Sequence, residues 1–266
     1  MKITVAKGGC LAGATALCMS AVSLPGPGPP GPGPPSPGAH GLGLHGPGLP
    51  GLGAIDPRTE ADQTGLPWSA VALLLIPGVA RCTAVAVAPH WAVTAAHCIN
   101  HRALGHAAPP SSIHLVFGYR SGDYTRLLVP TAIRLPAGAD PAATEVRGTD
   151  VAFLHVAETL TDLLPPTDAG PGATVALGGY GQDRAERLAI DPHCTVLAQV
   201  PAADHAPVLQ HGCSGTRGVS GGALAMEVAP GTWRLAGMAV AAQIGGAGGY
   251  AVPGGRLATL LAALPP

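Results

Sequence analysis

The chain has 266 residues, a formal net charge of −1 and only 11% charged residues. This length suits one domain of about 200 to 250 residues plus an additional segment. So few charges leave no basic stripe for nucleic acid and no polybasic patch for an anionic membrane, so we expect neither nucleic-acid binding nor stable membrane insertion.

The N-terminus has the pattern of an export signal. Lys2 and Lys7 border the apolar, uncharged stretch CLAGATALCMSAVSL, which is short for a membrane span and runs into proline and glycine. Small residues at Ala21 and Ser23 predict cleavage after Ser23. We therefore expect residues 1–23 to be a signal peptide and the protein to be secreted or periplasmic in a bacterium. The alternative is a disordered or membrane-anchoring N-terminus.

Residues 24–54 are dominated by proline and glycine. The glycines fall at irregular spacings, so the segment is not a collagen triplet repeat. Such a composition cannot bury a core and predicts an extended, mobile tether or a pro-segment. The globular domain is expected to cover residues 55–266.

Short apolar runs separated by Gly, Pro and Asp fill the chain after residue 55. Runs of this length predict antiparallel β structure of the sandwich or barrel type. In chain order the predicted strands cover residues 69–76, 82–88, 91–96, 112–119, 124–135, 151–156, 173–181, 194–200, 222–228 and 233–243.

One convincing helix is predicted near the C-terminus, over residues 253–264. Its leucines have helical spacing, and Pro265 ends it. Residues 95–104 have the sequence for one further helical turn.

Four cysteines remain once the signal peptide is removed: Cys82, Cys98, Cys194 and Cys213. An even number in an exported chain predicts two disulfides, with three connectivities open. Metal ligation is the rival interpretation, and it needs compact Cys/His pairs. Only Cys98 with His101 and His211 with Cys213 come near such a pair, so we expect disulfides and no metal.

Three local patterns carry the chemistry. WAVTAAHC holds His97, GTDVAFLHV places Asp150 before an apolar strand, and GVSGGAL surrounds Ser220. Each is weak alone, because a histidine is usually structural, an aspartate before a strand is usually a turn residue, and G-x-S-G-G arises by chance in a glycine-rich chain. In this order and with these flanks they are a strong joint signal.

The residue types suit nucleophilic catalysis. A serine hydroxyl needs a base to accept its proton, and a neutral imidazole does this near pH 7. The imidazole in turn needs a carboxylate that fixes its tautomer. Glycines beside the serine allow a sharp turn that aims two N–H groups at a developing oxyanion. Here those donors would be the amides of Gly218 and Ser220.

TAAHC, DVAFL and GVSGG resemble the signature blocks of the chymotrypsin/trypsin-like serine peptidases, in the bacterial-type branch. The resemblance covers roughly residues 66–264. It implies an all-β fold of two antiparallel six-stranded barrels with a C-terminal helix. His97 and Asp150 would come from the first barrel and Ser220 from the second.

The same resemblance implies the disulfide pairs and the activity. Cys82 and Cys98 match the bridge that pins the loop of the catalytic histidine, which leaves Cys194 with Cys213. The protein would be a monomeric serine endopeptidase that acts on peptide or protein substrates through an acyl-enzyme and uses no cofactor. The alternative is a catalytically silent binding or scaffold protein on the same fold. An α/β-hydrolase is excluded because no histidine follows Ser220.

Val219 precedes the serine, where activated animal members of the family have an aspartate. That aspartate pairs with a cleaved Ile-Val-Gly-Gly amine, and this chain lacks that start as well. Losing one partner would leave a buried charge unpaired, whereas losing both has little effect. We hypothesise that packing of Val219 and the link at Cys213 hold the loop, so that activation needs no new amino terminus.

The resemblance places the floor of the substrate pocket near Ser214 and one wall at Val240, Ala241 and Ala242. No aspartate lies at the floor, so a preference for Lys or Arg is not predicted. The wall histidine of glutamate-specific relatives is absent as well. The small wall residues predict a neutral, apolar substrate side chain.

Overall fold

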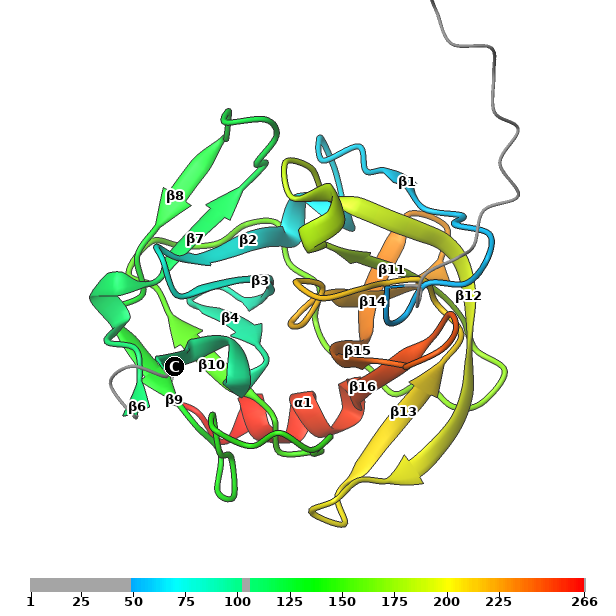
Figure 1. Ribbon diagram of the computed structural model, residues 1–266. Coiled ribbons are helices and arrows are strands. Elements are labelled where there is room, and N and C mark those ends of the chain that lie inside the picture. The colour runs from blue at the N-terminus through cyan, green and yellow to red at the C-terminus, as the bar shows by residue number, and fades with distance from the viewer. Residues whose placement is uncertain (1–48, 102–105, 266) are drawn as a thin grey trace, which may run out of the picture. The chain divides into compact units, whose positions relative to one another are not determined.

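A computed structural model describes residues 49–101 and 106–265 (Figure 1). The predicted signal peptide and most of the predicted tether lie outside these residues. The described part is mostly β-strand, with one α-helix near its C-terminal end. The all-β fold with a C-terminal helix is therefore confirmed. None of the described helices is long and apolar enough to cross a membrane.

Seven antiparallel strands form the first sheet, in the order β8-β7-β2-β3-β4-β10-β9. Their bounds are β2 Val71–Ile76, β3 Ala80–Ala88, β4 Trp91–Thr94, β7 His114–Phe117, β8 Arg126–Leu128, β9 Ala132–Arg134 and β10 Ala152–His155. The edge strands β8 and β9 do not pair with each other in the described part of the chain, so this sheet is a half-barrel rather than a closed six-stranded barrel. Pro130, which has no N–H, splits the single run predicted over residues 124–135 into these two short strands.

The second sheet closes into a barrel. Its order is β1-β12-β11-β14-β15-β16-β13, and β13 also pairs with β12, which closes six strands and leaves β1 outside. Their bounds are β1 Thr59–Glu60, β11 Thr174–Gly179, β12 Ala189–Pro201, β13 Pro207–His211, β14 Ala223–Ala229, β15 Thr232–Ala242 and β16 Gly249–Pro253. Strand β12 can reach β1, β11 and β13 because it is 13 residues long.

Short helices and one small hairpin complete the described chain. They are the 3₁₀ helices η1 Trp68–Ala70, η2 Ala96–Ile99, η3 Pro110–Ser112 and η4 Gln182–Arg184, the strands β5 Asn100–His101 and β6 His106–Ala107, and the helix α1 Gly254–Ala262. Helix α1 packs against β15 and β16. The helical turn predicted within residues 95–104 is η2.

The two sheets pack side by side (Figure 1). Thr83 of β3 joins them through hydrogen bonds. Its hydroxyl donates to the Gly218 carbonyl (3.0 Å) and accepts from the Tyr180 N–H (2.9 Å). The Tyr180 side chain is fully buried, and its hydroxyl donates to Gln63 (2.9 Å). The two buried hydrogen bonds of Thr83 hold the end of β11 and the loop after residue 216 against the first sheet.

Both disulfides form, Cys82–Cys98 and Cys194–Cys213. These are the pairs implied by the family resemblance. The first ties β3 to η2, and the second ties β12 to the chain just after β13. Loops of this length reduce the entropy of the unfolded chain by an amount worth about 3 kcal/mol each.

Candidate active site

His97 and Asp150 lie at the same end of two paired strands. His97 is on η2, directly after β4, and Asp150 precedes β10, which pairs with β4. His97 Nδ1 and Asp150 Oδ2 are 2.7 Å apart, and the His97 backbone N–H donates to Asp150 Oδ1 at 2.9 Å. With Nδ1–H donated to the carboxylate, Nε2 is the ring atom left to accept a proton. The imidazole is 33% exposed and the carboxylate only 12%.

Asp204 anchors the loop that carries Asp150. Its carboxylate accepts the N–H groups of Gly148 (3.1 Å) and Thr149 (2.9 Å) and the Thr149 hydroxyl (2.6 Å). Burial alone would raise the pKa of Asp204, but these hydrogen bonds outweigh it and lower the pKa. Asp204 lies between β12 and β13, so a residue of the second barrel holds the loop of the first barrel that carries Asp150. No sequence motif marks this residue.

The loop around Ser220 depends on two glycines. Gly218 has φ +93° and Gly221 has φ +83°, a region that side chains disfavour. A Cβ on Gly221 would overlap the Thr83 carbonyl oxygen, and one on Gly218 would lie 2.5 Å from the Tyr180 oxygen. Backbone therefore passes too close at both positions for any other residue.

The N–H groups of Gly218 and Ser220 are the two donors expected from the sequence to bind an oxyanion. Among the described residues, neither N–H donates a hydrogen bond within the chain. Both carbonyls are held by Thr83, whose hydroxyl donates to Gly218 and whose N–H donates to the Ser220 oxygen (2.8 Å). The carbonyls of both residues are thus held, and their N–H groups are left for a ligand.

Ser220 and His97 line one cleft of about 810 Å³, together with Gly218. Cys98, next to the histidine, has its Sγ 3.7 Å from the Ser220 carbonyl oxygen. Within the described chain no hydrogen bond links the His97 ring to the Ser220 hydroxyl. Such contacts are often long without substrate and tighten when it binds. His97, which is bonded to Asp150, and Ser220 thus line the same cleft.

Val219 is buried, at 5% exposure, and its side chain packs among glycines. If a Cβ were added to Gly179, Gly222 or Gly215, it would lie 2.7, 3.2 or 3.4 Å, respectively, from Val219 Cγ1. The small neighbours leave room for the valine beside the nucleophile. This packing fits the hypothesis that an apolar residue holds the loop here.

A cavity of about 290 Å³ opens beside Ser220. Val240, Ala241 and Ala242 line it, as the sequence led us to expect. Ser214 does not line it. Its backbone N–H donates to the buried carboxylate of Asp191 at 2.7 Å, and the next two residues, Gly215 and Thr216, line the cavity.

Two buried polar side chains that the sequence analysis did not assign to the pocket, His211 and Thr216, line the same cavity. His211 Nε2 and Thr216 Oγ1 have no hydrogen-bond partner among the described residues. The Cys213 N–H donates to His211 Nδ1 (3.3 Å), so Nε2 carries the ring proton. Burial lowers the pKa of His211 to about 4, so the ring is neutral at pH 7. The sequence analysis weighed His211 only as a metal ligand.

His211 should make the protein sensitive to acid. Its pKa is about 4 when folded against 6.5 in its ordinary state, so between these values the unfolded chain binds more protons. Its contribution is complete above pH 6.5 and is lost as the pH falls to 4, by at most about 3 kcal/mol. Urea unfolding at pH 7 and pH 4.5 should show this loss in the parent and in His193→Gln, an exposed control, but much less in His211→Leu. Equal losses in all three proteins would refute it.

Cys82, Cys98 and His97 place potential metal-binding atoms within 4.8 Å of one another. The two sulfurs are joined in a disulfide and offer no thiolate, so this cluster is not a metal site.

The fold is a half-barrel that carries a His–Asp pair and a closed barrel that carries a G-x-S-G-G loop. A family model described as Trypsin matches residues 55–255, and the chain belongs to this family. Among solved structures, a Glu endopeptidase in complex with MPD is similar in fold, with a TM-score of 0.61 and 16% identity over 80% of this chain and 98% of that chain. A search of curated proteins finds no match.

Proposed function

We propose that the protein is an exported serine endopeptidase with a His97–Asp150–Ser220 triad. The observation that carries the proposal is that His97, whose ring lies 2.7 Å from Asp150, lines the same cleft as Ser220. Membership of the trypsin family supports peptidase chemistry on peptide substrates.

The proposed reaction has two halves. Ser220 Oγ forms a bond to the scissile carbonyl carbon while His97 Nε2 takes the hydroxyl proton, and the Gly218 and Ser220 N–H groups bind the oxyanion. The C–N bond then breaks, and the leaving amine receives the proton from His97. In the second half a water, deprotonated by His97, attacks the acyl carbon. The bond from that carbon to Ser220 Oγ then breaks, Oγ takes the proton back from His97, and the acid is released. Asp150 holds the imidazole and stabilises its charged form.

Export and domain organisation belong to the same proposal. Residues 1–23 would be removed, and residues 24–48 would be a tether or pro-segment. Residues 49–54, which the sequence assigned to the tether, are bonded to the second barrel through Gly51, so the monomeric peptidase domain would cover residues 49–266. The two disulfides support an oxidising compartment outside the cytoplasm.

We propose an acidic substrate side chain, in place of the neutral, apolar one expected from the sequence. The buried His211 N–H and Thr216 hydroxyl line the cavity as donors without partners, and Arg217 adds a cation to its lining. No acidic side chain lines it within the described residues. A carboxylate only accepts hydrogen bonds, whereas the amide of glutamine brings an N–H₂ group that needs acceptors of its own. The similarity in fold to a Glu endopeptidase is consistent with this choice.

One experiment tests both activity and preference. Folded parent protein and Ser220→Ala are treated with a fluorophosphonate and, separately, with peptides from a digested denatured proteome. We expect a label on Ser220 and cleavage after glutamate more than after glutamine, with Ser220→Ala silent in both assays. An unlabelled, inactive parent would support the alternative of a silent binding or scaffold protein. A labelled parent that cleaves equally after Glu and Gln would overturn only the substrate preference.

A further inference from the structure

The segment that precedes the barrels is fastened to the second barrel at two places. Gly51 joins two stretches that border the cavity beside Ser220, because its N–H donates to Gln243 (2.6 Å) and its carbonyl accepts from Gly215 (3.1 Å). Further on, Thr59 and Glu60 pair with β12 as strand β1. Residues 49–60 are thus part of the folded domain.

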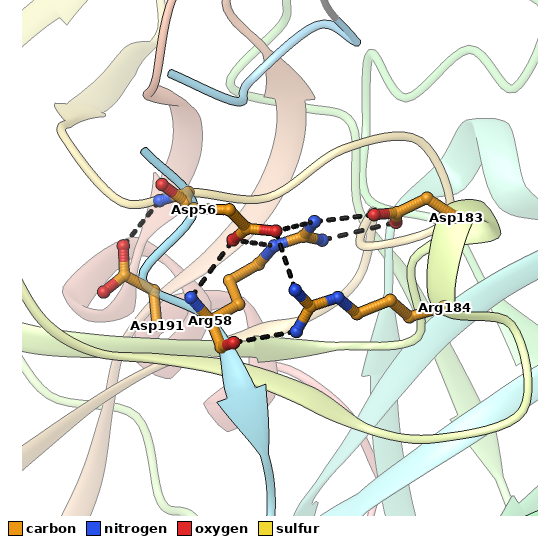
Figure 2. Close-up of polar contacts among 6 residues, drawn as sticks. Asp56, Arg58, Asp183, Arg184 and Asp191 are labelled. Carbon is orange, nitrogen blue, oxygen red and sulfur yellow. Dashed lines mark hydrogen bonds and ion pairs between the residues drawn. The ribbon is translucent and has the colours of Figure 1, made fainter. Parts of the chain in front are cut away.

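Arg58 forms the centre of an ion cluster in this segment (Figure 2). Its guanidinium lies between two carboxylates and donates to Asp56 (2.8 and 2.9 Å) and to Asp183 (2.6 Å). Arg184 adds a bond to Asp56 and one to the Arg58 carbonyl, both at 2.8 Å. Arg58 is only 6% exposed, and a buried charge deprived of its partner is strongly destabilising.

Arg58 interacts strongly with both Asp56 and Asp183. The hydrogen bond from Arg58 comes first among the causes that hold the pKa of Asp56 at about 2. Asp183 lies 125 residues further along the chain, on η4, so its pair with Arg58 ties the N-terminal segment to the turn after β11. Two carboxylates facing one planar fork restrain this turn in orientation as well as in distance.

That turn contacts the loop of the proposed oxyanion donors directly. The Gln182 N–H donates to the Arg217 carbonyl at 2.7 Å. An ideal Cβ on Gly218 would lie 2.5 Å from the Tyr180 oxygen and 3.1 Å from the Gln182 nitrogen, so the two backbones are in close contact. The Arg217 carbonyl that Gln182 binds belongs to the same peptide group as the Gly218 N–H, which is a proposed oxyanion donor.

We infer that Arg58 is a positioning residue for the oxyanion loop. Its pair with Asp183 holds residues 181–184 against Arg217 and so fixes the Gly218 N–H. The segment 49–60 is therefore a retained part of the working enzyme, and cutting it away lowers activity instead of raising it. The inference rests on the proposed function for its catalytic consequence but not for its structural one.

The test uses the full chain and two variants, Arg58→Met and Glu60→Gln. Methionine keeps much of the length and removes the charge. Glu60 is the matched control, because it lies on the same segment but its carboxylate pairs with Arg120 and Arg187, and among the described residues it forms no ion pair with Arg58 or η4. In Arg58→Met, amide hydrogen exchange over residues 212–222 should be about 10-fold faster or more. In the same variant kcat should fall by about 10- to 100-fold with little change in KM, part of the 10²–10³ lost with a whole oxyanion donor. Glu60→Gln should match the parent in both measurements.

Asp183→Asn is the milder second variant if Arg58→Met does not fold, because it leaves the Arg58–Asp56 pair in place. It should show the same direction of change in exchange and in kcat. Exchange over residues 212–222 equal to that of Glu60→Gln, or faster exchange with unchanged kcat, would overturn the inference. A parent that takes no fluorophosphonate label would refute the proposed function instead, and the exchange measurement would still decide whether Arg58 holds the loop.

Discussion

Asp150→Asn is expected to slow acylation on the order of 10⁴-fold while leaving the fold intact, which is the loss typical of a Ser-His-Asp triad. The carboxylate accepts from both the ring and the backbone of His97, at 2.7 and 2.9 Å. An amide of the same shape can still accept from the backbone, but it presents either a weaker acceptor or an N–H₂ group to Nδ1. In the second case Nδ1 becomes the acceptor, and Nε2 carries a proton and cannot take one from Ser220.

The rate of fluorophosphonate labelling and the burst with a p-nitrophenyl ester measure this loss. Asp140→Asn is the control, because Asp140 is exposed on the chain leading to Asp150 and accepts only a local N–H, from Ala142. It should leave both rates unchanged. If Asp150→Asn acylates as fast as the parent, Asp150 does not orient His97 and the triad is wrong.

Gly221→Ala is expected to be the most destabilising of the small substitutions described here. A Cβ at this position would overlap the Thr83 carbonyl oxygen and lie 2.5 Å from Thr94 Oγ1, and φ is +83°. Thr83 is on a central strand of the first sheet, so the clash can be relieved only by moving the Ser220 loop. We expect a loss of at least about 4 kcal/mol in the free energy of unfolding, as is typical when a substitution combines a steric clash with backbone strain. Fluorophosphonate labelling at Ser220 should be lost as well.

Gly231→Ala separates the clash from backbone strain alone. Gly231 also has a positive φ, +71°, but it lies at the turn between β14 and β15, and nothing would lie within 4 Å of its Cβ. Gly231→Ala should lower the free energy of unfolding, measured with urea, by about 1 kcal/mol and leave fluorophosphonate labelling of Ser220 normal. Equal losses at the two glycines would mean that the close approach to Thr83 is relieved without harm.

Much of the fold was predictable because strands of this domain are locally apolar and end at local breakers. The apolar runs that form β2, β3 and β14 are bounded by turn residues, which end these strands whatever register they pair in. Strand β13 was missed because Pro207–His211 has only two strongly apolar residues, Val208 and Leu209. It becomes a strand because β12 and β16 lie on either side of it and bond to its backbone.

The candidate site divides in the same way. His97, Asp150 and Ser220 stand in local motifs, since each needs particular neighbours for its turn or strand, and the sequence alone was enough to propose them as the triad. The even number of cysteines likewise predicted the bridges.

Only the tertiary structure decided what surrounds the proposed triad. It placed His211 and Thr216, and not Ser214, at the cavity beside Ser220, and it paired Arg58 with Asp183 across 125 residues. A polar side chain acquires its function from the partner it meets, and that partner depends on strand register and on the closing of the second barrel. Neither is encoded in the few residues on each side, so no local pattern could reveal these contacts.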